Sequence, residues 1–202
     1  MFLNCHKSIL RARCKKWEQM PYIAMLMTEK ALQALKDYLY TGLYDPAKIN
    51  EEDKKSLVSA CEKLELQELL DLCEGKSVDT YRTLVDDFER LYKTSEGADF
   101  EIIVGDEKIP CHKAILAARS QLYLGMFTSV SDPSNSVPDF SGRSAESIRA
   151  LLLYLYTDKT DHINYEIAKE LIEASSFYGL YNHTLDEVCE KIILNHESQE
   201  KK

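Results

Sequence analysis

The sequence predicts a mainly helical α+β fold, present as one complete copy and one partial copy. Three observations lead to this prediction. Two sequence blocks recur in the same order, amphipathic helix patterns follow each block, and one short β-hairpin pattern precedes only the second copy. The 202 residues suffice for one ordinary domain or two small ones. A hydrophobic fraction of 45% and a charged fraction of 29% are typical of a folded globular protein.

The internal repeat rests on two blocks. Residues 5–14, CHKSILRARC, match residues 111–120, CHKAILAARS, which lie 106 positions later. Residues 34–41, ALKDYLYT, match residues 150–157, ALLLYLYT, which lie 116 positions later. The second copy therefore carries about ten extra residues around 128–137. Their Ser, Asp, Pro and Asn content indicates a surface loop.

Amphipathic helices accompany each copy. Apolar residues at helical spacing predict a helix after Ser144 as N-cap, and a matching helix after Thr28 in the first copy. Two further amphipathic segments follow in each copy. A strong apolar stripe also marks residues 80–93, ahead of the second copy. Its members are Tyr81, Leu84, Val85, Phe88, Leu91 and Tyr92.

A β-hairpin is predicted only in the second copy. Residues 100–104 favour a strand, Gly105 and Asp106 a turn, and residues 108–111 the returning strand. The first copy starts only a few residues before its own His6, which leaves no room for such a hairpin. We therefore expect an N-terminally truncated partial domain over 1–76, a linker over 77–79, a complete domain over 80–196 and a charged tail over 197–202.

Composition and motifs argue against several function classes. The net charge of −9 is the opposite of a nucleic-acid footprint, and no apolar run is long enough for a membrane span. The six cysteines are isolated in sequence, and with no apolar signal segment we expect them reduced, in the cytoplasm or nucleus. One Cys-His pair per copy is too few ligands for zinc, and no phosphate loop or hydrolase motif is present. We expect no catalytic, cofactor or metal residues and no enzymatic activity.

At this point a family resemblance is recognisable. The segment ADFEIIV at 98–104, the HKxxL pattern at 112–116, the ARS triplet at 118–120 and the YLYT ending of the helix at 154–157 resemble the BTB/POZ signature. Asp158 stands where the family commonly has Gly, and the first copy has Gly42 there. Two copies in one chain look like the double-BTB proteins.

The resemblance implies a small sheet flanked by a helical cluster, and dimerisation. It places the 80–93 helix at a dimer interface through Tyr81, Leu84, Val85 and Phe88, although the same stripe could be core of its own domain. It also implies a charged pocket from Asp99 and Lys113, for which a structural ion pair or two solvated charges are the alternatives.

Family members are often substrate adaptors of cullin-3 ubiquitin ligases. Those adaptors carry a hydrophobic-x-Glu motif in a loop that here reads Val130-x-Asp132, with Asp in place of Glu. The first copy lacks this loop. We therefore expect an interaction module that pairs with itself or another BTB protein, and binds cullin-3 and an unknown ubiquitination substrate. The alternative is a structural scaffold without a ligase role. Nucleic acid and membranes are not expected partners.

Overall fold

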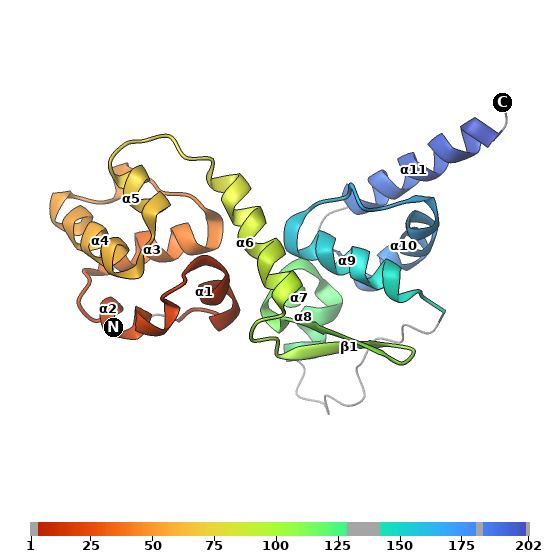
Figure 1. Ribbon diagram of the computed structural model, residues 1–202, viewed down its shortest axis with the longest axis horizontal. Helices are drawn as coiled ribbons and strands as arrows, with labels where there is room; N and C mark the ends of the chain where they lie inside the picture. The colour runs from red at the N-terminus through yellow and green to blue at the C-terminus, as the bar shows by residue number, and fades with distance from the viewer. Residues whose placement is uncertain (1–3, 129–141, 181–183, 201–202) are drawn as a thin grey trace. The chain divides into compact units, whose positions relative to one another are not determined.

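The computed structural model describes residues 4–128, 142–180 and 184–200 (Figure 1). They divide into two compact units at Gly97–Ala98. Described residues of the first unit form helices, and the second unit adds one antiparallel hairpin to a cluster of helices. The expected α+β fold is therefore confirmed.

The first unit is a cluster of helices around one apolar core. Leu35, Leu39, Leu57, Leu64 and Leu69 are fully buried at its centre. Its elements are α1 (Lys7–Arg13), the 3₁₀ turn η1 (Trp17–Gln19), α2 (Met20–Ala24), α3 (Glu29–Thr41), the 3₁₀ turn η2 (Pro46–Lys48), α4 (Glu51–Leu64), α5 (Gln67–Cys73) and α6 (Thr80–Thr94).

Side-chain caps fix where the longer helices begin. Thr28 Oγ1 accepts the Ala31 N–H at the start of α3, and Asn50 Oδ1 accepts the Asp53 N–H at the start of α4. α3 ends at Gly42, whose φ of 72° is a left-handed conformation that favours glycine. The helix start expected after Thr28 is thus confirmed.

Helix α6 lies in the first unit and packs against α1. The compact units divide at Gly97, three residues beyond the end of α6. Polar contacts from α6 to α1 and α5 hold the helix in the first unit. The sequence-based domain bounds, with α6 opening the second domain after a linker at 77–79, stay a prediction.

The second unit consists of a hairpin and five helices within its described part. Its elements are β1 (Phe100–Val104), β2 (Glu107–Cys111), α7 (Lys113–Arg119), α8 (Gln121–Thr128), α9 (Ala145–Thr157), α10 (Tyr165–Tyr178) and α11 (Thr184–Glu200). The strands form the expected hairpin and pair from Phe100 opposite Cys111 to Val104 opposite Glu107, so the second strand begins one residue before the predicted 108–111. Ile102 and Ile109, which face each other across the pair, are both buried.

The two units repeat the same helices where the sequence repeats. α1 and α7 have seven residues each, α3 and α9 have 13, and α4 and α10 have 14. Ser144 Oγ caps α9 by accepting the Ser147 N–H, as Thr28 caps α3. Asp158 ends α9 with a φ of 58°, at the place that Gly42 takes after α3.

Candidate interaction site

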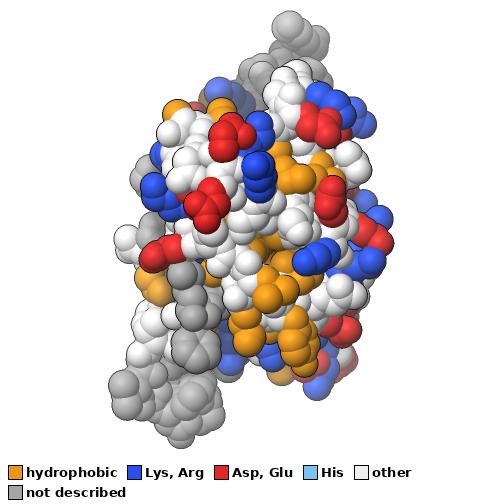
Figure 2. All heavy atoms as spheres, turned by 90° about the vertical axis from the view of Figure 1, so that its left-hand side faces the viewer, with side chains coloured by type: hydrophobic (Ala, Val, Ile, Leu, Met, Phe, Trp, Pro, Cys, Tyr) orange, Lys and Arg blue, Asp and Glu red, His pale blue; other side chains and the backbone are white. Residues whose placement is uncertain are grey.

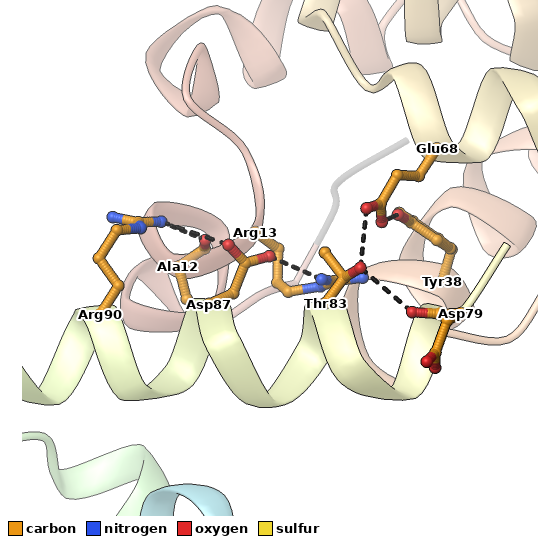
Figure 3. Close-up of polar contacts among 8 residues, drawn as sticks. All are labelled: Ala12, Arg13, Tyr38, Glu68, Asp79, Thr83, Asp87 and Arg90. Atoms are coloured by element: carbon orange, nitrogen blue, oxygen red, sulfur yellow. Dashed lines mark hydrogen bonds and ion pairs between the residues drawn. The ribbon is translucent and has the colours of Figure 1, made fainter.

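The most developed contact surface in the first unit is the one that holds α6 (Figure 3). Arg13, at the end of α1, donates from Nη1 to Asp87 Oδ2 of α6 at 2.7 Å. Its guanidinium also lies 4.9 Å from the centre of the Tyr38 ring, and only 1% of its side chain is exposed. One turn further along α6, Arg90 Nη2 donates to the carbonyl of Ala12 at 2.6 Å.

A second group of contacts joins the start of α6 to α5. Glu68 accepts hydrogen bonds from the hydroxyls of Thr83, at 2.8 Å, and Tyr38, at 3.0 Å (Figure 3). The three α6 residues Thr83, Asp87 and Arg90 lie four and three positions apart, so they share one side of the helix. A polar side of α6 thus recognises the first unit.

Burial dominates the electrostatics of this surface. It raises the pKa of Asp87 above its ordinary value, although Arg13 opposes the rise, and the nearby carboxylate of Glu68 adds to it. Glu68 and Asp87 therefore repel each other. The Arg13 guanidinium, which contacts Asp87 directly, offsets part of this repulsion, and Arg90 adds to the offset.

The expected interface stripe lies on the roughly opposite side of α6 from Thr83, Asp87 and Arg90, since a helix turns about 100° per residue. Tyr81 is 67% exposed, whereas Leu84, Val85 and Phe88 are half-buried. The structure thus brings these four residues together on one face. Their role in dimerisation stays a prediction.

Asp99 and Lys113, the expected charged pocket, are also brought together, but through the backbone. Asp99 Oδ1 accepts the Lys113 N–H at 2.8 Å and so caps the first turn of α7. Lys113 Nζ lies 5.5 Å from the centre of the Phe127 ring. Within the described part of the chain, no ion pair joins the two side chains. The contact is therefore a helix cap.

The repeated histidines mark equivalent junctions. The His112 N–H donates to Tyr156 Oη at 2.9 Å, and His112 Nδ1 is 2.7 Å from the same oxygen, with both residues buried. In the first unit, His6 contacts Tyr40 Oη in the same two ways, each at 2.9 Å, but His6 is exposed. Each histidine thus joins the start of a short helix to the end of a long one.

Val130 and Asp132, the expected cullin-contact residues, lie outside the described residues. Sequence reasoning missed the polar side of α6 altogether. The amphipathic pattern drew attention to the apolar stripe, and no motif singled out Asp87. One available signal was the repeat itself, which aligns Arg13 with Arg119 of the second copy.

Hydrophobic side chains gather on one face of the molecule (Figure 2). The most exposed large apolar residues of the first unit are Tyr22, Met25, Leu26 and Leu43. Across the described residues, no helix is long and apolar enough to span a membrane. No cluster of three or more His, Cys, Asp or Glu side chains there could hold a metal ion.

A hairpin joined to a cluster of helices defines an α+β domain. The family model for the BTB/POZ domain matches residues 88–197, which is more than half of the chain. The chain therefore belongs to the BTB/POZ family, whose members are typically interaction modules with protein partners rather than enzymes.

Curated relatives agree with this assignment. The leucine-zipper-like transcriptional regulator 1 homolog of Drosophila melanogaster is 36% identical over 108 residues, 50% of this chain and 11% of that protein. TD and POZ domain-containing protein 3 of Mus musculus is 28% identical over 117 residues, 57% and 32% of the two chains. Kelch repeat and BTB domain-containing protein 3 of Homo sapiens is 32% identical over 97 residues, 48% and 15%. The chain spans a third or less of each of these relatives.

Proposed function

We propose that this chain is a tandem BTB module that self-associates, or pairs with another BTB protein, and recruits a substrate to cullin-3. The proposal of self-association is supported by the apolar face of α6, on which Tyr81 is two-thirds exposed. The polar side of the same helix contacts α1 through Arg13 and Asp87. The tandem character is supported by the matched helix lengths and by the His6–Tyr40 and His112–Tyr156 contacts.

Self-association is tested on the full chain by light scattering. Replacing both Leu84→Asp and Phe88→Asp should give a folded monomer, because losing a buried anchor at an interface costs about 2 kcal/mol or more. Arg82→Asp is the matched control, since Arg82 is on the exposed side of the same helix and its side chain is 79% exposed. An unchanged mass for the double variant would assign the stripe to the core of the chain itself.

The ligase role rests on Val130-x-Asp132 in the second copy. The apolar residue would enter a pocket on cullin-3, and the carboxylate would accept hydrogen bonds beside it. Asp is one methylene shorter than the usual Glu, and a stretched hydrogen bond weakens steeply. We therefore expect micromolar or looser binding, about −8 kcal/mol.

Calorimetry against the cullin-3 N-terminal domain tests this role. Asp132→Glu should tighten binding and Val130→Asp should abolish it, whereas Ser131→Asp, which adds a charge between them, is the control for charge alone. If neither the natural chain nor Asp132→Glu gives detectable heat, the module is a structural scaffold without a ligase role.

A further inference from the structure

Two equivalent arginines meet different partners in the two units. Arg119, at the end of α7, pairs with Asp158, the residue that ends α9, and lies 5.6 Å from the centre of the Tyr154 ring. Arg13 lies over Tyr38 in the same manner, but Gly42 stands at the place of Asp158. The first unit therefore offers Arg13 no carboxylate at that place, and Asp87 of α6 supplies one.

Gly42 also makes room for α6. A Cβ atom at Gly42 would lie 3.2 Å from the carbonyl oxygen of Thr80 and 3.5 Å from Thr80 Cβ, in the first turn of α6. Such a contact is tighter than ordinary packing, so any side chain there presses on the helix. Gly42 thus offers Arg13 no carboxylate at the end of α3 and lets the backbone of α6 approach.

We propose that the first unit is a selective helix-binding surface, that Arg13 and Gly42 are the residues that select its occupant, and that this occupant is α6 of the same chain. The chemistry recognised is a helix with a hydroxyl at Thr83, a side-chain oxygen at Asp87 that accepts the Arg13 hydrogen bond, and a guanidinium at Arg90. The second unit cannot select such a helix in this way, because Asp158 already engages Arg119.

The short connection to α6 favours the same chain as the source of the helix. Six residues, 74–79, separate α5 from α6. Lys76 fixes part of this connection, because its N–H donates to the Asp71 carbonyl at 2.9 Å and its Nζ contacts the Asp71 and Glu74 carboxylates. A tether this short gives α6 a high effective concentration at its surface, against which a helix from a second copy competes poorly.

Hydrogen–deuterium exchange on the full chain tests the selection, read on peptides from α1 and α6. Arg13→Met should raise exchange in both at least about tenfold, because it leaves the half-buried Asp87 carboxylate beside Glu68 with only the longer contact to Arg90, at 3.7 Å, as counter-charge. Asp87→Asn alone should change exchange little, since the carboxylate that it removes is itself costly to bury. In the Arg13→Met background, Asp87→Asn should restore most of the protection. Additive effects, with no restoration, would overturn the role of Arg13.

Gly42 is tested by two substitutions of equal size. Asp and Asn both tolerate the left-handed backbone and both crowd Thr80, but only Asp offers Arg13 a rival carboxylate. Exchange in α1 and α6 should therefore rise in the order natural chain, Gly42→Asn, Gly42→Asp. Equal exchange in all three would overturn the proposal, and equal effects of Asn and Asp would overturn the competition for Arg13. If α4 loses protection too, the substitution destabilises the whole first unit. The selection is then judged from the Arg13→Met and Asp87→Asn variants alone.

Two controls separate the selection from other effects. Arg119→Met and Asp158→Asn remove the matching pair in the second unit and should leave exchange in α1 unchanged. Exchange is also measured at two protein concentrations about 50-fold apart. A helix from the same chain gives concentration-independent protection of α1, whereas protection that falls on dilution would mean that α6 comes from a second copy.

Discussion

Tyr156→Phe and Tyr40→Phe remove the same hydroxyl from the two histidine junctions and should have unequal costs. Tyr156 Oη satisfies both the N–H and Nδ1 of His112, and the histidine is only 1% exposed. Its loss leaves two buried polar groups without that partner, at about 1–3 kcal/mol each, so the second unit should lose roughly 2–6 kcal/mol. His6 is exposed, so water replaces Tyr40 Oη and the first unit should lose less than about 1 kcal/mol.

Urea unfolding of the full chain, followed by pulsed hydrogen exchange, reports the units separately through peptides of α3 and α9. With a slope of about 1–3 kcal/mol per molar urea, Tyr156→Phe should lower the midpoint of α9 by roughly 1 M or more. Tyr40→Phe should move the midpoint of α3 by a small fraction of that. Equal shifts in the two units would show that burial does not set the cost of the lost hydroxyl, and the argument would fail.

Three further predictions concern the first unit and the thiols. Because burial raises the pKa of Asp87, its protonated form favours docking of α6. The resulting stability is fully present below the unfolded pKa of about 3.9 and is lost as pH rises through the folded pKa. The urea midpoint of α1 should therefore fall between pH 4 and pH 7. In Asp87→Asn this dependence of the midpoint on pH should disappear. Iodoacetamide at pH 8 should label half-buried Cys5 first and Cys111, whose pKa burial raises to about 12, only on unfolding, as mass spectrometry would show. Residues 1–76 alone should not unfold cooperatively, whereas residues 1–97 should unfold more cooperatively, since only the longer piece contains α6. A cooperative circular-dichroism transition for 1–76 would contradict this.

The local elements of this fold are predictable because their signals are local. Ser144 and Thr28 each precede an apolar pattern of helical period, and both cap a helix. Gly105 and Asp106 separate two β-favouring runs, and those runs pair as an antiparallel hairpin. Each of these signals involves residues within a few positions of one another, so the sequence alone carries it.

The placement of α6 is not predictable in this way. An apolar stripe reveals which side of a helix is buried, but not the element that it meets. The contact that places α6 joins Arg13 to Asp87, 74 positions apart. It also depends on Gly42, which has no side chain to crowd α6 or to pair with Arg13. The Asp99–Lys113 contact shows the same limit: proximity followed from the family pattern, whereas its form, a carboxylate on a backbone N–H, needed coordinates.

The hairpin explains why the two copies of the short helix depend on different supports. In the second unit, Asp99 directly precedes β1 and satisfies the first N–H of α7, so the hairpin carries its own cap to the helix. The matching helix α1 has no side-chain cap at His6. Its start is held by Tyr40 through His6, and its C-terminal end by α6, where Arg90 reaches the Ala12 carbonyl and Asp87 holds Arg13. The C-terminal end of α1 is therefore sensitive to changes in α6.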